Sequence, residues 1–285
     1  MLKKLLLAFA GLPLGVLYFF SDIVFFVGYY ILHYRQHVVR ENLARSFPEK
    51  TAEERKVIEK RFFRHLCDIM AEILKNIGSD SSVITGRIRF SNIELLKELH
   101  ARGKSITLYA AHYGNWEWLT VLPLYVPYRM IAFYQPLSNS MFDELMKGSR
   151  EKYGITAIPS SQAFRALKNY SDEGVLTLSL VLGDQSPPPS GQWVWLDFLN
   201  QPTAFLLGAN KIARKLEQAV VYPHFKKVGR GHYEVEMILI HPGQDESGDH
   251  PIIRNYAARL EESIHQDPAL WLWSHRRWKL DPDEG

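Results

Sequence analysis

Apolar runs that favour β-strands alternate with segments that favour helices along most of this chain, and this alternation restricts its fold more than any other feature. The predicted strands cover residues 87–90, 106–111, 130–134, 157–158, 175–182, 193–198, 219–225 and 233–241. The predicted helices cover residues 34–47, 51–77, 92–101, 139–153, 162–170, 204–216 and 255–265, with a further helical pattern from residue 116. The sequence therefore predicts one α/β domain with a mainly parallel central sheet flanked by helices, in which the last two strands can pair antiparallel.

Composition narrows the class of protein. The 285 residues are 46% hydrophobic and 23% charged, which is typical of a globular chain with a sizeable core. A net charge of +3 is too small to indicate nucleic acid as a partner, although it suits an anionic surface. Cys67 is the single cysteine, so an internal disulfide and a cysteine-based metal site are both excluded.

The amino terminus differs in composition from the rest. Residues 5–32 carry one formal charge, Asp22, and are otherwise almost entirely apolar, aromatic, Gly or Pro. A secretory signal is one alternative, but the apolar character continues past any convincing cleavage site. We therefore expect a membrane-associated helix, with a buried core helix as the alternative. Pro13 and the pair Ser21-Asp22 leave two forms open: one kinked span, or a helical pair lying in one leaflet.

A histidine follows one of the most apolar predicted strands. His112 comes directly after residues 106–111, Gly114 permits a tight turn, and Asn115 is expected to cap the helix that follows, with Glu117 in its first turn. Ligands of open α/β sheets bind at the carboxyl ends of strands. A carboxylate beside a histidine fixes its tautomer and stabilises the imidazolium. We expect His112 to be a general base with Glu117 as its partner. The alternative is a strand-end histidine beside a glutamate that only favours the helix dipole.

Two further polar residues have a chemical interpretation. Asp184 follows the strand predicted at residues 175–182, also at its carboxyl end, where it serves either a functional site or the capping of the loop. Arg150 lies near the end of the helix predicted at residues 139–153, where a cation can belong to a site or simply compensate the helix dipole.

The carboxyl-terminal tail combines indoles with cations. They are Trp271, Trp273, His275, Arg276, Arg277, Trp278 and Lys279. Such a mixture can stack on bases or meet lipid phosphates at a membrane interface, and the apolar amino terminus favours lipid.

The string His112-Tyr-Gly-Asn-Trp-Glu117 resembles the H-x-G-N-W-E motif of the lipid A biosynthesis lauroyl and myristoyl acyltransferases, which belong to the lysophospholipid acyltransferase superfamily. The resemblance covers nearly the whole chain and includes the apolar amino terminus, the basic residues 39–47, the run Gly183-Asp184-Gln185 and the tail at residues 271–279. It implies a glycerol-3-phosphate acyltransferase-like fold, with residues 1–32 as a membrane anchor and residues 33–285 as an acyltransferase domain.

The resemblance also implies an activity and a location. Members move a fatty acyl chain from acyl carrier protein to a hydroxyl of a lipid A precursor glycolipid, with no cofactor or metal. They act at the cytoplasmic face of the bacterial inner membrane. By position, His112 is then the general base and Glu117 its partner, while Arg150 and Asp184 match the family's other two polar site positions. The remaining polar residues that we expect to contact substrate are Asn115, Gln185, Arg276 and Arg277.

The chain departs from the family pattern in two places. Tyr134-Gln135-Pro136 stands where many members have Tyr-Arg-Pro, which removes one basic contact near the acceptor. Leu199-Asn200 stands where members usually have Phe-Gly, and because Asn tolerates left-handed backbone, we expect the turn to survive.

Other functions stay open at this point. The nearest is acyl transfer to another acceptor, of the aminolipid or phosphatidylinositol mannoside type. A more distant one is a metal-dependent hydrolase with His112, Glu117, Asp184 and His224 as ligands. The last is a membrane-attached lipid-binding protein without catalysis, which would leave the pair of His112 and Glu117 at a strand end unexplained.

Overall fold

A computed structural model of the chain describes residues 2–134, 139–188, 190–243 and 249–281. Among these residues, strands of one large sheet lie in the order β1-β9-β8-β2-β5-β3-β4, and β6 and β7 form a separate hairpin. The strands are β1 Ile88–Phe90, β2 Ile106–Ala110, β3 Arg129–Tyr134, β4 Thr156–Pro159, β5 Thr177–Leu182, β6 Trp193–Phe198, β7 Gln201–Leu206, β8 Ala219–Gly229 and β9 His232–His241.

The sheet is mainly parallel, as the sequence predicts. Strand β2 pairs in parallel with β5 and β8, β3 with β4 and β5, and β1 with β9. Only β8 and β9 pair antiparallel among the described strands of this sheet, which confirms the expectation for the last two strands.

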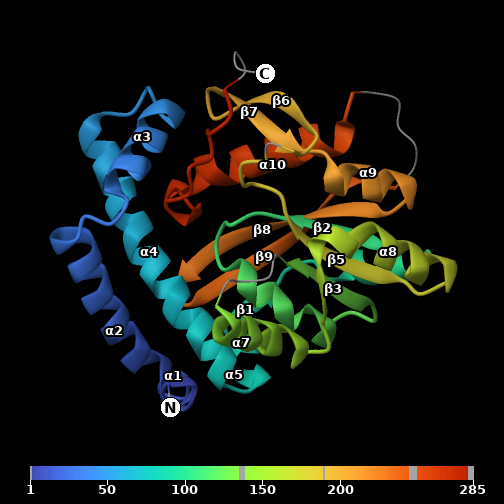
Figure 1. The fold of residues 1–285 in the computed structure, drawn as a ribbon, viewed down its shortest axis with the longest axis horizontal. Helices are drawn as coiled ribbons and strands as arrows, with labels where there is room; N and C mark the ends of the chain where they lie inside the picture. The colour runs from blue at the N-terminus through green and yellow to red at the C-terminus, as the bar shows by residue number, and fades with distance from the viewer. Residues whose placement is uncertain (1, 135–138, 189, 244–248, 282–285) are drawn as a thin grey trace.

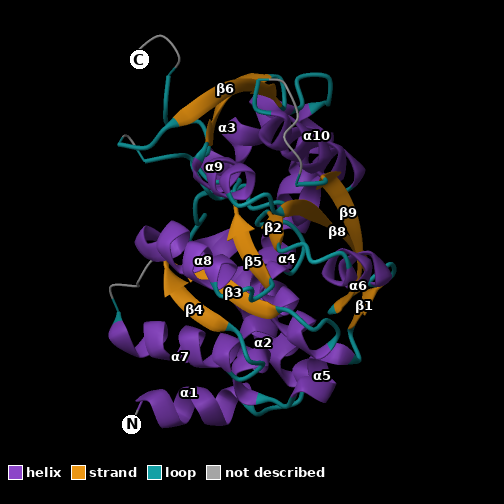
Figure 2. Cartoon of the chain, turned by 90° about the vertical axis from the view of Figure 1, so that its right-hand side faces the viewer, coloured by secondary structure: helices purple, strands orange, loops and turns teal. Residues whose placement is uncertain are grey.

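Helices flank the sheet (Figures 1 and 2). The α-helices are α1 Leu2–Ala10, α2 Leu14–Phe26, α3 Gln36–Ser46, α4 Ala52–Gly78, α5 Ser81–Thr85, α6 Glu94–Ala101, α7 Ser140–Glu151, α8 Ala163–Asp172, α9 Gly208–Lys215 and α10 Pro251–Gln266. The 3₁₀ and π segments are η1 Val27–Ile31, η2 Trp116–Leu124, η3 Ser160–Gln162 and η4 Pro268–Leu270. Helix α10 packs on β8 and β9, α9 on β2, and α8 on β4 and β5.

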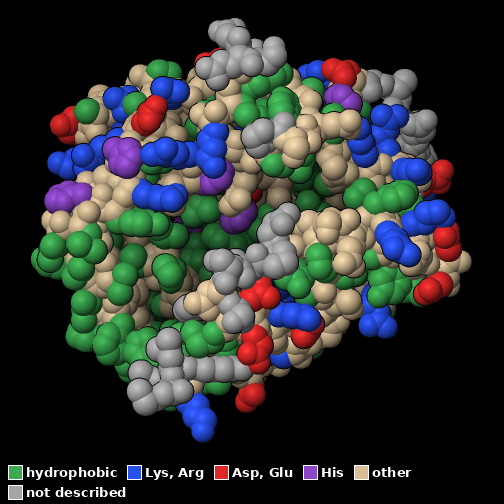
Figure 3. Space-filling model, viewed as in Figure 1, with side chains coloured by type: hydrophobic (Ala, Val, Ile, Leu, Met, Phe, Trp, Pro, Cys, Tyr) green, Lys and Arg blue, Asp and Glu red, His purple; other side chains and the backbone are tan. Residues whose placement is uncertain are grey.

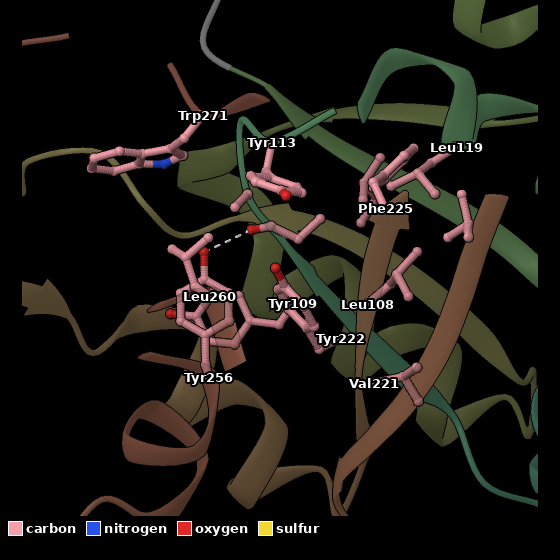
Figure 4. Packing of buried hydrophobic residues seen from close by; sticks show 14 of the residues in the cluster. Leu108, Tyr109, Tyr113, Leu119, Val221, Tyr222, Phe225, Tyr256, Leu260 and Trp271 are labelled. Carbon is pink, nitrogen blue, oxygen red and sulfur yellow. Dashed lines mark hydrogen bonds between the residues drawn. The ribbon is translucent and has the colours of Figure 1, made fainter. Parts of the chain in front are cut away.

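The core is built on strand β2, whose residues are all buried. Figure 4 shows aromatic rings gathered around it: Tyr109 stacks on Tyr256 of α10 with ring centroids 4.0 Å apart. The hydroxyl of Tyr256 donates a hydrogen bond of 2.9 Å to the carbonyl oxygen of Ala110. This packing holds the last residues of β2 in place immediately before His112.

The amino-terminal helices lie along α4 rather than apart from the fold (Figure 1). The helical structure is interrupted between α1 and α2, around Pro13. Helix α2 then runs through Ser21 and Asp22 without interruption. Residues Leu14–Ile31 are long and apolar enough to cross a membrane, by length and composition, and 28% of this stretch is buried in the fold. The continuity of α2 corrects the expectation of a break at Ser21-Asp22.

The hairpin before α9 is the main difference from the predicted elements. Residues 204–206 belong to β7, not to a helix, because Gln201–Leu206 pairs antiparallel with Trp193–Phe198 and this pairing outweighs local helix propensity. The turn of the hairpin is left-handed at both Leu199 (φ 52°) and Asn200 (φ 62°), so the turn expected at Asn200 is present.

Polar residues at the starts of α4 and α6 have different roles. Thr51 and Glu54 form a capping box at the start of α4. Asn92 does not cap α6, because its side chain instead bonds the backbone of Met237 in β9.

Candidate active site

Two neighbouring strands bring His112 and Asp184 together. Strands β2 and β5 run in parallel with Ala110 opposite Leu182, so the residues that follow them meet at the same edge of the sheet. His112 Nδ1 lies 2.8 Å from Asp184 Oδ1, and the backbone nitrogen of His112 donates to Asp184 Oδ2 at 3.0 Å. Asp184 is buried, so its carboxylate is fixed by these contacts.

The pairing determines the tautomer of His112. An ionised carboxylate can only accept hydrogen bonds, so Nδ1 carries the proton and Nε2 of the neutral ring has a free lone pair. The side-chain amide of Gln185 lies 3.4 Å from Nε2, a long contact that a tighter donor can replace. Trp116 packs edge-on against the ring, with centroids 4.9 Å apart. The ring is therefore oriented to accept a proton at Nε2.

The electrostatics of the pair favour the imidazolium. Burial alone lowers the pKa of His112, but the charge of Asp184, its hydrogen bond and the charge of Glu117 outweigh burial, so the pKa is raised above its ordinary value of 6.5. Burial alone raises the pKa of Asp184, and His112 together with the donors around the carboxylate lowers it below its usual range. Asp184 thus stays ionised beside a ring that readily takes a proton.

The tail completes the surroundings of Asp184. The indole Nε1 of Trp271 donates a hydrogen bond of 2.8 Å to Asp184 Oδ2. Trp271 and Trp273 are 3% and 0% exposed, which corrects the expectation that these indoles lie at a lipid interface. Asn42 of α3 helps to hold the tail by donating to the carbonyl oxygen of Trp273. Trp271 thus supports Asp184 from inside the fold.

The two arginines of the tail do not line the cavity at His112 within the part of the chain that the structure describes. Arg277 is buried, donates to the carbonyl oxygen of Ala204 and lies over the ring of Phe205 at 4.8 Å. Burial lowers its pKa to about 10. Arg276 is exposed on the surface. Neither arginine therefore lines this cavity: Arg277 packs inside the fold, and Arg276 lies on the surface.

Glu117 has a different partner from the one that the sequence predicts. Its carboxylate accepts a hydrogen bond of 2.8 Å from Arg150 of α7, with a second contact of 3.4 Å to Arg150 Nε. Asp184, not Glu117, holds the imidazole, so the prediction that Glu117 orients His112 is wrong. Both Glu117 and Arg150 line the cavity at His112, and Glu117 acts on the ring through its charge.

Asn115 lies beneath the site rather than in it. Its side chain is fully buried and donates a hydrogen bond of 2.6 Å to Glu72 of α4. It does not cap η2 through its side chain and is not among the described residues that line the cavity. Asn115 therefore neither caps η2 nor is exposed to a ligand, which corrects both expectations. Its side-chain amide instead fixes the turn after His112 by bonding Glu72.

A cavity of about 640 Å³ opens at His112, which is within the usual range for small-molecule sites. Its polar side carries His112, Glu117, Asp143, Lys147, Arg150 and Gln185. Its apolar lining residues include Phe133 of β3, Leu167 of α8, Val181 and Leu182 of β5, Leu206 of β7 and Ile212 of α9. Figure 3 shows this face of the molecule hollowed near its centre, with hydrophobic side chains inside. The cavity thus combines apolar lining residues with charged and polar ones around His112.

Gly114 shapes the turn after His112. Its φ is +64°, and a Cβ there would lie 2.7 Å from Cβ of Phe225 in β8. We therefore expect Gly114→Ala to lower the free energy of unfolding by about 1–3 kcal/mol from backbone strain and crowding. Urea unfolding measures this change.

The matched control is Gly103→Ala, since Gly103 has a similar φ of +69° but no atom within 4 Å of the added Cβ. Equal losses in the two variants would show that crowding by Phe225 adds nothing.

The residues of the metal-hydrolase alternative are not gathered in one place. His224 bonds Ser263 and lines a separate cavity between β8, β9 and α10, away from His112. In the described ranges, no group of three or more His, Cys, Asp or Glu side chains is arranged to hold a metal ion.

Gln135 and Pro136 lie outside the described residues, so the contact predicted to be missing there has no structural description. Sequence reasoning missed Lys147 and Asp143 as cavity residues and Glu72 as a partner of the turn that follows His112.

Comparison with known protein families identifies the family of this chain. The model of the bacterial lipid A biosynthesis acyltransferases matches residues 4–280. None of the curated proteins compared with the chain matches it. Because the family match spans nearly the whole chain, this protein belongs to the bacterial lipid A biosynthesis acyltransferase family and is an acyltransferase.

Proposed function

We propose that this member of the lipid A biosynthesis acyltransferases transfers a fatty acyl chain from acyl carrier protein to a hydroxyl of a lipid A precursor, with His112 as the general base. The observation that carries the proposal is the hydrogen bond of 2.8 Å between His112 Nδ1 and Asp184, with His112 lining a cavity that also has many apolar lining residues. Asp184 is the residue that orients His112 in this proposal.

The chemistry needs no covalent enzyme intermediate. Nε2 of His112 takes the proton of the acceptor hydroxyl as its oxygen attacks the thioester carbonyl. The tetrahedral intermediate then collapses to the ester and expels the thiolate of the carrier, which takes the proton from the imidazolium. Asp184 keeps the ring in the right tautomer and stabilises its positive charge in between.

The charged rim of the cavity supports an acceptor with phosphate groups. Arg150 and Lys147 of α7 present positive charge to the cavity, and Glu117 fixes the position of the Arg150 guanidinium. The second negative charge near His112, on Glu117, also favours the imidazolium. In this proposal Glu117 and Arg150 act as one unit that binds the acceptor beside the base.

The apolar side of the cavity is the proposed place for the acyl chain. Leu167 of α8 and Ile212 of α9 both line the cavity, with Thr107 and Ser179 of the sheet among the other lining residues. A chain that lies there brings its thioester to the polar side, at His112.

We further propose that residues 1–32 hold the protein on the cytoplasmic face of the inner membrane, with residues 33–285 as the acyltransferase domain. The left of Figure 3 shows hydrophobic side chains gathered over α1 and α2. The outer face of α2 exposes Phe19 (63%), Ile23 (44%), Val24 (55%) and Phe26 (56%), while its inner face packs on α4. A helix with one face docked and the other apolar supports attachment in the plane of the interface rather than a free span.

Charges on the outer face of α2 should release the protein from membranes. We expect the double variant Phe19→Glu, Val24→Glu to move most of the protein from the pellet to the supernatant in vesicle sedimentation, because both side chains are more than half exposed. The measurement uses vesicles of phosphatidylethanolamine and phosphatidylglycerol.

The matched control is Val57→Glu, Val228→Glu, which places the same charges at positions that are each 59% exposed but lie on α4 and β8. Release by the control variant to the same extent would contradict attachment through α2.

Mass spectrometry of total lipids from cells with and without the gene tests the proposed acceptor. The proposal expects a lipid A species that lacks one acyl chain when the gene is deleted, with the chain restored by the wild-type gene. A change confined to an aminolipid or a phosphatidylinositol mannoside would assign the activity to that acceptor instead.

A further inference from the structure

A buried glutamate joins the amino-terminal helix to the catalytic turn. Glu72 of α4 is 0% exposed. Its Oε1 accepts a hydrogen bond of 2.8 Å from the hydroxyl of Tyr18 in α2. Its Oε2 accepts bonds of 2.6 Å from the amide of Asn115 and 2.9 Å from the hydroxyl of Tyr233 in β9. One carboxylate therefore contacts α2, β9 and the turn that carries His112.

The bond to Asn115 is directional. A carboxylate accepts only, so the nitrogen of the Asn115 amide must face Glu72. The amide oxygen of Asn115 is buried and has no hydrogen-bond partner within the described part of the chain. The side chain of Asn115 is thus held by Glu72, three residues after His112 and directly before Trp116, which packs on the His112 ring.

The surroundings of Tyr18 fit a built contact. Gly231, at the turn between β8 and β9, has a φ of +64°, and any Cβ there would collide with the Tyr18 hydroxyl. The guanidinium of Arg230 lies over the Tyr18 ring at 4.4 Å and bonds both Asp22 of α2 and Asp68 of α4. These contacts fix the hydroxyl of Tyr18 against Glu72.

Leaving such a carboxylate without its donors is costly, since buried polar groups without partners destabilise a fold. If α2 moves away from α4, Glu72 loses the donor from Tyr18, and its remaining bonds to Asn115 and Tyr233 must readjust. The strain falls on the turn that places His112 and Trp116.

We infer that Glu72 is a positioning residue for acyl transfer. In this inference the packing of α2 on α4, through Tyr18, holds the turn at residues 112–116 in its active geometry. The helix proposed to bind the membrane is then also part of the frame of the site. This inference rests on the proposed function only for its kinetic test.

The first experiment compares two single-atom changes on the inner face of α2 in the full chain in detergent micelles. Tyr18→Phe removes the donor to Glu72. Ser21→Ala removes the other α2 hydroxyl bonded to α4, which donates to Asp68 at 2.9 Å and has no link to Asn115. Hydrogen exchange of the peptide that spans residues 112–118 is the readout, because it does not depend on activity.

The inference expects Tyr18→Phe to raise amide exchange in this peptide several-fold and Ser21→Ala to leave it at the wild-type rate. Equal exchange in the three proteins would overturn it. Equal increases in both variants would also overturn it, since they would reflect general loosening of α2.

The second experiment measures kcat and KM per folded molecule, well below the unfolding temperature. We expect Tyr18→Phe to lower kcat about tenfold with KM for the acyl donor unchanged, while Ser21→Ala keeps both values. A wild-type protein that transfers no acyl group would refute the proposed function but leave the exchange result standing.

Substitutions at Glu72 complete the test. Glu72→Gln keeps an oxygen for Asn115 and Tyr233 and offers its nitrogen to the hydroxyl of Tyr18, which can accept. We expect it to retain most of the kcat, whereas Glu72→Leu loses it. Full activity in Glu72→Leu would contradict the inference, and if this variant does not fold, the comparison of Tyr18→Phe with Ser21→Ala decides.

Discussion

Replacing His112 with Ala is expected to lower the rate of acyl transfer by at least about 10²–10⁴-fold, the usual contribution of a general base. The proton of the acceptor hydroxyl then has no acceptor at the position of Nε2. The loss should appear in kcat, because the apolar lining residues from β3, α8, β5 and α9, where the acyl chain is proposed to bind, are unchanged. Steady-state transfer of labelled acyl groups from acyl carrier protein measures the change.

The fold should survive this substitution. The His112 side chain is 15% exposed and lies at the end of β2, while the core around Tyr109 and Tyr256 does not depend on it. Thermal unfolding of the variant serves as the control. Transfer at near-normal rates by a folded His112→Ala protein would remove His112 from the mechanism.

Replacing Asp184 with Asn is expected to have the second largest effect, a loss on the order of 10²–10⁴-fold. Asn can donate to Nδ1 of His112 through its amide, and this favours the tautomer with the proton on Nε2, where the base must accept. The amide also leaves the imidazolium without its adjacent negative charge. Glu117 cannot replace it, because its carboxylate is paired with Arg150.

The same variant should change the dependence of rate on pH. The base works in its neutral form, and the pKa of His112 is raised above 6.5 mainly by Asp184 acting against burial, so the wild-type rate rises with pH through a value above 6.5. Without the Asp184 charge, burial prevails and the pKa of His112 falls, so the residual rate of Asp184→Asn should reach its plateau at lower pH.

Trp271→Phe is the matched control for Asp184→Asn. It removes the indole donor to Asp184 Oδ2 but keeps the bond between Asp184 and His112 Nδ1. We expect a loss well below that of Asp184→Asn. A Trp271→Phe protein that is as inactive as Asp184→Asn, or an Asp184→Asn protein with wild-type rate and pH profile, would contradict the assigned role of Asp184.

Position along a parallel sheet made the site predictable. His112 and Asp184 each follow an apolar run that becomes a central strand, so their meeting at one edge follows from strand direction. The choice of partner did not follow. Glu117 is near His112 in sequence, but the left-handed Gly114 turns the chain into the 3₁₀ segment η2, and Glu117 meets Arg150 of α7 instead. Which carboxylate holds the ring depends on how distant segments pack.

Burial of the tail could not be predicted from composition for the same reason. A Trp- and Arg-rich segment has the same letters whether it meets lipid or packs inside, and the contact of Trp271 with Asp184 joins residues 87 positions apart. The sequence does contain a signal for the role of Glu72. It lies on the buried face of α4 with Ile58, Phe62 and Ile69, at helical spacing, where a charge requires partners.

Mass spectrometry of the acceptor after reaction tests the central claim most directly. Purified protein is incubated with ¹³C-labelled acyl carrier protein thioester and a lipid A precursor, with His112→Ala in parallel. The account predicts that the precursor gains the mass of one labelled acyl chain as an ester, and that this product is lost with His112→Ala. A precursor of unchanged mass, with the label found as free fatty acid, on another lipid or covalently on the protein, would contradict it.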